Sequence, residues 1–294
     1  MSGPNMRLAA LRRFAVTITV LNLLGRTVLG FENSWAQMVV ALVMAYITET
    51  ILEMVDAAAT KKPPRFAGGI TNFIDFLLPA HIAGMAVSML LYCGGRLLPF
   101  AFASVVAIAS KALFTAKVNN AARHFLNPSN SGIVATVLLF PSLAPIMPWQ
   151  FTENLTTHWS TAFALIVVTF GTYLNWYYAR RIPLVIGWML AFGVQGVIRC
   201  LINGLPLFVG LVPMTGVSFL LFTFYMITDP GATPSDRREQ VIFGASTAFV
   251  YSFLVLTHVG FAFFFALFIV SFCRGLLLHL KEARLGTNTS QETS

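Results

Sequence analysis

The sequence is poor in charged residues and has no paired cysteines, and both shortages narrow what the chain can be. Only 10% of its 294 residues are charged, 57% are hydrophobic and the mean hydropathy is +0.76. A soluble domain carries about 25% charged residues, so the composition indicates a polytopic membrane protein. The cysteines Cys93, Cys200 and Cys273 each stand alone in an apolar stretch, which excludes a CxxC redox pair, a zinc site and an iron–sulfur cluster.

Several functional motifs are also missing. The chain has no dinucleotide-binding glycine motif, no haem motif and no small-residue cleavage site after Arg12 and Arg13, so the first apolar segment is expected to remain as a span. We predict no catalytic residues and no metal ligands. The net charge of +8 lies in short clusters between apolar runs, which favours membrane lipid over nucleic acid as a partner.

Apolar runs of about 20 residues predict about ten transmembrane helices in an all-α fold. They are expected at residues 14–29, 35–55, 70–92, 97–114, 131–147, 159–178, 182–202, 205–227, 240–256 and 260–280. With a cytoplasmic N-terminus, only Arg26, Arg96 and Arg199 among the 19 basic residues fall outside cytoplasmic segments. We therefore expect a multi-pass protein of the bacterial inner membrane with both termini in the cytoplasm.

The number of spans also suggests an internal duplication. Ten spans divide into two sets of five, and an odd number of spans inserts the second set upside down. We expect one transmembrane domain at residues 13–284, with inverted repeats at about 13–150 and about 158–284. A cytoplasmic segment, residues 1–12, precedes it, and a polar tail, residues 285–294, is expected to be disordered in the cytoplasm.

A polar, helix-breaking stretch at residues 123–132 interrupts the apolar pattern with the sequence RHFLNPSNSG. Proline disfavours helix in the residue before it, and asparagine and serine side chains cap or turn the backbone. Broken backbone in a membrane protein survives only where it is buried in protein or lines a watery cavity. The candidate cofactor- or substrate-binding residues here are Arg123, His124, Asn127, Ser129 and Asn130.

A second turn-rich stretch, residues 228–238, closes the eighth predicted span with the sequence TDPGATPSDRR. Both stretches are expected on the cytoplasmic side, and both contain proline, hydroxyl groups and arginine. Helix N-termini and arginine side chains suit a phosphate or a carboxylate, whereas the alternative is a simple cytoplasmic turn. The candidates in this stretch are Thr228, Asp229, Thr233 and Arg237.

Ionisable residues inside predicted spans are costly and usually face a cavity or the protein interior. Glu49 and Glu53 lie four residues apart near the end of the second span. They either pair with Lys61, Lys62 or Arg65 as an interfacial acidic cap or form a site where a cation or proton enters.

Two further ionisable residues, Asp75 and His81, lie in the third span on either side of Pro79. A helix break at the proline would bring both toward one cavity, as in a proton or ligand site. The alternative places Asp75 near the lipid headgroups and lets His81 bond a carbonyl across a helix interface. Glu49, Asp75 and His81 are our candidates for an ion or proton pathway.

At residues 123–130 and 228–234 the sequence resembles the NqrB/RnfD family, whose members are membrane components of the sodium-translocating NADH:quinone reductase and of the Rnf electron-transport complex. The match looks closest to the UnbU-type, enediyne-associated subgroup, and it extends from about the third predicted helix to the tenth. It implies ten helices in two inverted repeats, similar to urea transporters. It also implies flavin-linked electron transfer coupled to ion movement, with partner subunits from a membrane redox complex or a biosynthetic cluster.

One departure from that family concerns its flavin. Redox members attach FMN to the threonine of a Ser-Gly-Ala-Thr motif, which this chain lacks; Gly231-Ala232-Thr233 belongs to the other turn. Covalent FMN is therefore not expected, which leaves non-covalent FMN or riboflavin as the cofactor of an electron-transport subunit. The alternatives are a transporter or channel for a small polar solute, ion or natural product on the same scaffold, and a membrane scaffold protein.

Overall fold

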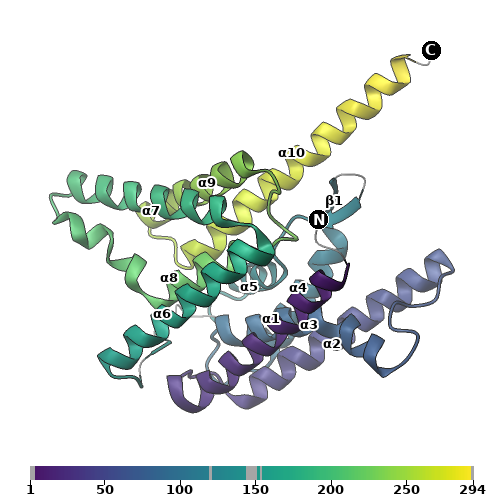
Figure 1. The fold of residues 1–294 in the computed structure, drawn as a ribbon, viewed down its shortest axis with the longest axis horizontal. Helices are drawn as coiled ribbons and strands as arrows, with labels where there is room; N and C mark the ends of the chain where they lie inside the picture. The colour runs from purple at the N-terminus through teal and green to yellow at the C-terminus, as the bar shows by residue number, and fades with distance from the viewer. Residues whose placement is uncertain (1–3, 119–120, 144–150, 153, 293–294) are drawn as a thin grey trace. The chain divides into compact units, whose positions relative to one another are not determined.

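The computed structural model describes residues 4–118, 121–143, 151–152 and 154–292, and it is predominantly helical (Figure 1). The α-helices are α1 (Pro4–Leu24), α2 (Trp35–Thr60), α3 (Ile70–Leu90), α4 (Leu98–Leu113), α5 (Pro128–Leu139), α6 (Thr157–Tyr173), α7 (Ile182–Ile202), α8 (Val217–Leu221), α9 (Arg237–Leu256) and α10 (Ala262–Glu292). Three of these helices continue into or are followed by π-helical turns, which are η1 (Gly25–Leu29), η2 (Leu174–Ala179) and η5 (Phe222–Met226).

Within the described residues, six helices are long and apolar enough to cross a membrane: α1 with η1, α2, α3, α7, α9 and α10. Helices α4 and α5, and α8 together with η5, are shorter apolar helices. Large apolar side chains on the long helices are exposed, among them Ile51, Leu190, Phe249 and Leu277, and contact with lipid chains would cover them. The fold is that of a helical membrane protein.

Four of the ten predicted spans are not among these six helices, and they are the spans expected at 97–114, 131–147, 159–178 and 205–227. The span expected at 205–227 is broken into the 3₁₀ turns η3 (Leu207–Gly210) and η4 (Val212–Thr215), followed by α8 and η5, because prolines and glycines recur through its first half. In the span expected at 131–147, helix α5 ends at Leu139 before a proline, and residues 144–147 lie outside the described residues.

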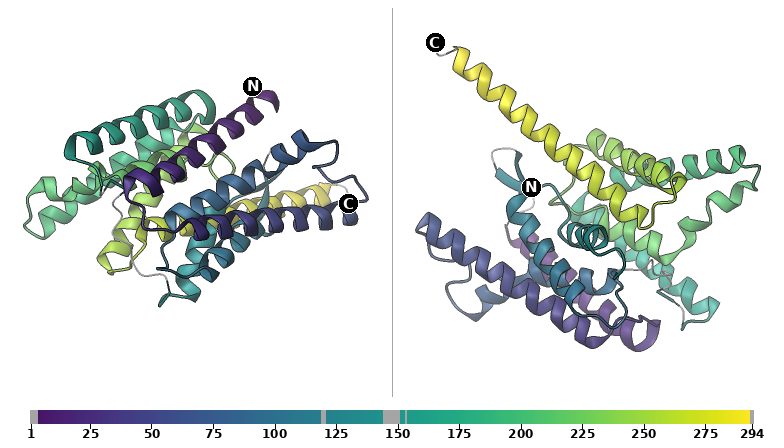
Figure 2. Two further views of the ribbon diagram at one scale, coloured as in Figure 1. Left: turned by 90° about the horizontal axis from the view of Figure 1, so that it is seen from below. Right: turned by 180° about the vertical axis from the view of Figure 1, so that it is seen from behind.

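The all-α prediction misses a small hairpin. Strands β1 (Thr115–Val118) and β2 (Ala121–His124) pair antiparallel, with Thr115 opposite His124 and Ala116 opposite Arg123. The pairing continues beyond the strands, because Phe125 N–H donates to the Phe114 carbonyl over 3.1 Å. At the other end of the chain, α10 extends to Glu292 and so covers most of the tail that was expected to be disordered (Figure 2).

The chain divides into two compact units. Unit 1 comprises residues 1–112 and 128–155, and in it α3 packs against α1, α2 and α5. Small residues allow these helices to approach closely: a Cβ on Gly132 of α5 would clash with the Ala103 carbonyl oxygen, and one on Gly84 would lie 3.1 Å from the Ala41 carbonyl oxygen.

Unit 2 comprises residues 113–127 and 156–294. Its helices α7 and α9 pack through glycines, since a Cβ on Gly244 would clash with the Leu184 carbonyl oxygen and one on Gly187 would lie 2.6 Å from that of Val241 (Figure 1). The fully buried Trp188 of α7 donates from Nε1 to Thr223 Oγ1 over 2.8 Å. Aromatic rings surround this tryptophan, from Phe192, Phe219, Phe222, Tyr251 and Phe263.

Candidate functional site

The two polar stretches singled out in the sequence meet in unit 2. His124, at the end of β2, has its Nε2 atom 3.8 Å from the Asp229 Oδ2 atom. Residue 231 must be small for this approach, because a Cβ on Gly231 would clash with the same ring nitrogen. Three residues after the histidine, the Asn127 Nδ2 atom donates to the Met226 carbonyl over 3.2 Å. The stretches are therefore in contact through both a charged group and the backbone.

The loop that follows η5 is held in shape by its own side chains. Asp229 Oδ1 accepts from the Gly231 N–H over 2.9 Å, which is an Asx turn ahead of the glycine. Thr233 Oγ1 donates to the Asp229 carbonyl over 2.6 Å, and Thr228 Oγ1 donates to the Phe224 carbonyl over 2.8 Å. Proline at 230 and glycine at 231 favour this local fold. The hydroxyl groups of Thr228 and Thr233 therefore stabilise the backbone of the loop.

Two arginines that the sequence did not single out hold the same loop. The buried Arg181, just before α7, donates from Nε to Thr233 Oγ1 over 2.8 Å and from Nη2 to the Pro230 carbonyl over 3.3 Å. Arg274 of α10 donates from Nη1 to the Ala232 carbonyl over 3.0 Å. The loop is therefore clamped between the start of α7 and the middle of α10.

A small pocket opens beside this loop, with a volume of about 260 Å³ that includes the solvent at its mouth. Its lining residues are Val118, Arg123, His124, Phe125, Gly231, Thr233, Ser235, Arg274 and Leu278. The part of this space that the protein encloses is about 10 Å³, which is room for about one water molecule, so it cannot enclose an isoalloxazine ring. A phosphate or carboxylate group would meet these side chains at the open mouth of the pocket.

Positive charge dominates around the pocket. Burial lowers the pKa of the Arg181 guanidinium, the Asp229 carboxylate raises it, and the nearby Arg274 and Arg123 lower it. Arg181 is thus close enough to Arg274 and Arg123 to be repelled by both, while the Asp229 carboxylate attracts Arg181 and the Glu239 carboxylate attracts Arg274. An anion in the pocket would relieve this repulsion.

The carboxylate of Asp229 is stabilised in its charged form. Burial raises the pKa of this group, but the His124 ring, the Gly231 N–H and the Arg181 guanidinium together lower it more, so that the pKa lies below its ordinary value. Asp229 is therefore a counter-ion for the arginines at neutral pH, and its carboxylate is not set up as a proton acceptor.

The remaining candidates of the two stretches lie elsewhere. Arg237 is exposed in the first turn of α9, where Asp236 caps the helix by accepting from the Arg238 and Glu239 N–H groups. Ser129 and Asn130 are buried in the first turn of α5, which belongs to unit 1. None of these three residues lines the pocket.

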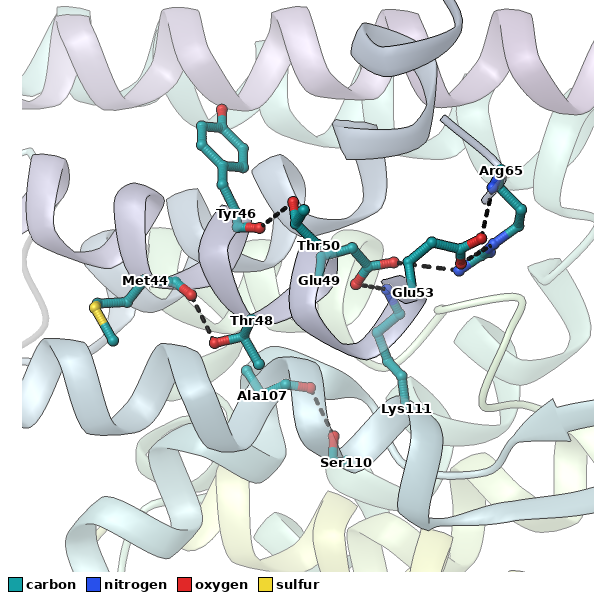
Figure 3. Close-up of polar contacts among 10 residues, drawn as sticks. All are labelled: Met44, Tyr46, Thr48, Glu49, Thr50, Glu53, Arg65, Ala107, Ser110 and Lys111. Atoms are coloured by element: carbon teal, nitrogen blue, oxygen red, sulfur yellow. Dashed lines mark hydrogen bonds and ion pairs between the residues drawn. The ribbon is translucent and has the colours of Figure 1, made fainter. Parts of the chain in front are cut away.

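Glu49 and Glu53 form a buried ion-pair cluster in unit 1 (Figure 3). The Lys111 Nζ atom of α4 lies 2.7 Å from Glu49 Oε2, and the Arg65 Nε atom lies 2.5 Å from Glu53 Oε2. The Arg65 guanidinium also lies 4.0 Å from Glu49. The sequence suggested Arg65 as a partner, but Lys111 was missed because it follows Glu49 by 62 residues.

Asp75 and His81 have separate partners, because α3 continues through Pro79 without a break. Asp75 pairs with Arg12 of α1, whose Nη2 atom lies 2.6 Å from Oδ2. The His81 ring lies between the hydroxyl groups of Thr19 and Tyr46, at 2.7 Å and 2.6 Å. The two side chains therefore do not share a cavity.

In the part of the chain that the structure describes, no group of three or more His, Cys, Asp or Glu side chains is placed to hold a metal ion. The site with the clearest chemical character is the basic pocket of unit 2. A scan against protein-family models and a search of curated proteins found no match to this chain.

Proposed function

We propose that this chain is an integral membrane transport protein that binds the anionic group of a small solute in the basic pocket of unit 2. The observation that carries the proposal is that Arg123 and Arg274 line one small pocket, with the buried Arg181 holding the loop beside it. Arginine binds phosphate and carboxylate through two parallel N–H donors, and Asp229 and Glu239 are the two carboxylates that interact with these three arginines, which leaves one positive charge unbalanced.

The membrane topology is part of this proposal. The grouping of Lys and Arg between the apolar runs supports ten spans with both termini in the cytoplasm of a bacterial cell, and it supports a pocket that opens on the cytoplasmic side. An inner-membrane transporter would there meet the phosphorylated and carboxylated solutes of the cell.

We also propose that the two units derive from inverted five-helix repeats, and three shared features support this. The first helix of each set ends in a π-helical turn, η1 or η2, that is capped by a left-handed residue, Gly30 or Arg180. A buried asparagine then ties that helix to a later helix of its unit: Asn22 donates to the Met85 carbonyl over 3.4 Å, and Asn175 donates to the Phe224 carbonyl over 2.7 Å.

A second candidate function is that of a membrane electron-transport subunit, as the NqrB/RnfD resemblance implies. The pocket would then hold the phosphate of a non-covalent FMN, whose ring would lie outside it, and partner subunits would supply electrons. The basic pocket favours FMN over riboflavin, because riboflavin carries no phosphate for the arginines to bind.

The test begins with the absorbance spectrum of the purified protein in nanodiscs. A flavin band that disappears from the protein on denaturation supports the electron-transport candidate, and a colourless protein supports transport. A band that stays with the denatured chain means covalent flavin and contradicts both forms of the proposal.

Anion binding is then measured by titrating inorganic phosphate into the wild type, Arg274→Gln and Arg238→Gln. We expect Arg274→Gln to weaken binding by about tenfold, since one charge-assisted hydrogen bond contributes about 1.5–3 kcal/mol. Arg238, exposed on α9 and outside the pocket lining, is the matched control, and its variant should bind like the wild type. Equal affinities in all three proteins would exclude the pocket as the binding site.

A further inference from the structure

His81 is held by side chains from two neighbouring helices of unit 1. Its Nε2 atom lies 2.7 Å from Thr19 Oγ1 of α1, and its Nδ1 atom lies 2.6 Å from the Tyr46 hydroxyl of α2. The Tyr46 ring also stacks on the imidazole, with centroids 6.2 Å apart and an angle of 16° between the planes. Both ring nitrogens are thus engaged, each by a group that has one hydrogen to donate.

The hydrogen-bond pattern identifies the protonation state of this ring. Thr19 Oγ1 donates its hydrogen to the Ala15 carbonyl over 2.7 Å, so toward His81 it can only accept. The Nε2 atom of His81 must therefore carry a hydrogen. The Nδ1 atom then accepts from the Tyr46 O–H group, and the structure corresponds to a neutral imidazole in the Nε2–H tautomer.

We infer that His81 is a proton-binding site inside the membrane region of unit 1 and that Tyr46 responds to its occupancy. A proton arriving from solvent can bind only at Nδ1, because Nε2 already carries one. Once Nδ1 is protonated it donates, so the Tyr46 hydroxyl oxygen must turn to accept and its hydrogen must find another acceptor. Binding of one proton therefore changes the contact between α2 and α3.

Most charged groups on the helices around His81 have partners of their own, and the side chains of Arg13 on α1 and Asp56 on α2 are exposed. The pairs are Arg12 with Asp75, Glu49 with Lys111, and Glu53 with Arg65, while Arg26 donates to the Asn22 side chain. Helix α5, which also packs on α3, carries no ionisable side chain. Within the described part of the chain, no carboxylate is bonded to the His81 ring. The positive charge of a protonated ring is therefore stabilised by the Thr19 and Tyr46 hydroxyl groups, so proton binding depends on the positions of α1 and α2, which carry them.

The simpler interpretation is that His81 stays neutral and only connects the helices by hydrogen bonds. Nitrogen NMR distinguishes this interpretation from a proton-binding His81. The full chain is labelled with ¹⁵N-histidine, placed in lipid nanodiscs and titrated from about pH 9 to about pH 4, which brackets the ordinary histidine pKa of about 6.5. The His81→Gln variant identifies the signals of residue 81 among the five histidines. His158 and His258 are exposed, and their signals are recorded in the same spectra.

We expect the His81 signals to show the Nε2–H tautomer at neutral pH and to convert to the imidazolium form on acidification. Signals of residue 81 that remain those of the neutral ring down to about pH 4 would overturn the inference. The Tyr46→Phe variant provides a test that keeps the histidine and so does not depend on His81→Gln folding. The Nε2–H tautomer should persist at neutral pH in this variant, because Thr19 still accepts from Nε2. Without the Tyr46 hydroxyl to accept from a protonated Nδ1, the ring should convert to the imidazolium form at a lower pH than in the wild type, and an unchanged titration midpoint would also overturn the inference.

Discussion

The Nε atom of Arg181 donates to Oγ1 of Thr233 over 2.8 Å, and both side chains are buried, at 6% and 5% exposure. The bond joins the residue that precedes α7 to the last turn of the loop at residues 228–234. A single contact between an arginine and a hydroxyl thus connects the proposed anion pocket to the helix that carries the aromatic core of unit 2.

We expect Thr233→Val to lower the unfolding free energy by about 1–3 kcal/mol, because it leaves the buried Arg181 Nε without an acceptor and removes the bond to the Asp229 carbonyl. The measurement is unfolding in increasing sodium dodecyl sulfate from mixed micelles. Ser235→Ala is the control, since Ser235 is exposed on the same loop. Equal losses in the two variants would mean that the arginine–threonine bond does not stabilise the loop.

Replacing Asn22 or Asn175 by alanine should destabilise the protein, and Asn22→Ala should do so more strongly, because Asn22 Oδ1 also accepts from Arg26 Nη1 and Ser88 Oγ over 2.7 and 3.0 Å. Each donates to the carbonyl four residues earlier, Ile18 or Gly171, and to a second helix of its unit. Hydrogen bonds between membrane helices contribute about 0.6–1.7 kcal/mol each, so each change to alanine should cost about 1–3 kcal/mol of unfolding free energy.

Asn203→Ala is the matched control for this pair. Asn203 also donates to the carbonyl four residues earlier, over 2.8 Å, but it is exposed and the bond stays within the end of α7. Its replacement should change the unfolding free energy by less than about 0.5 kcal/mol. A loss as large as that of Asn22→Ala would show that the bond between helices contributes nothing measurable.

Removing Lys111 alone should lower the unfolding free energy much more than replacing both Glu49 and Lys111. Glu49 and Lys111 side chains are 8% and 19% exposed, so Lys111→Met leaves a buried carboxylate with only Arg65 at 4.0 Å, and we expect a loss of about 3–5 kcal/mol. The double variant Glu49→Leu, Lys111→Met removes both charges and should recover most of that loss. Unfolding in sodium dodecyl sulfate measures both.

Lys117→Met is the control for an ion pair in contact with solvent. Lys117 and Glu282 lie 2.9 Å apart with side chains 70% and 40% exposed, and such pairs contribute about 0–1 kcal/mol. If Lys117→Met and Lys111→Met destabilise the protein equally, burial does not determine the strength of the Glu49 pair.

Stability should depend on Asp229 in acid. The folded protein lowers the pKa of this carboxyl, so its contribution is fully present above the unfolded value of about 3.9 and is lost as the pH falls through the folded pKa. We expect the melting temperature of Asp229→Asn to lie below that of the wild type at about pH 7 and the gap to narrow below about pH 4. A gap that stays constant over this range would contradict the prediction.

The sequence predicted the long helices and singled out the two polar stretches, but it did not predict that the two stretches are in contact. Runs of about 20 apolar residues are local signals, and α2, α3 and α7 begin at the residues where their runs begin. The contact of His124 with Asp229 joins residues far apart in the sequence. Both stretches are polar and contain proline, and this shared character is what singled them out as candidates.

Other features could not be found from the sequence, because they depend on packing. Arg181 and Arg274 looked like ordinary basic residues at the ends of spans, and nothing in their neighbours indicated a loop 49 and 42 residues away. A helix break at Pro79 was one of two alternatives, but α3 continues through the proline, since neighbouring helices can satisfy the backbone group that a proline leaves free. The hairpin at residues 115–124 carries too few β-forming residues to predict a pair of strands.

The close contact of α7 and α9 at Gly187 and Gly244 limits how unit 2 can move. Backbone atoms meet there without side chains between them, so neither helix can slide or rotate past the other without a clash. A conformational cycle must therefore carry the two helices together as one rigid body. The turn η3 is held to α7 in the same way, because a Cβ on Gly210 would clash with the Gly196 carbonyl oxygen. The rigid body of unit 2 therefore extends from α7 and α9 to η3.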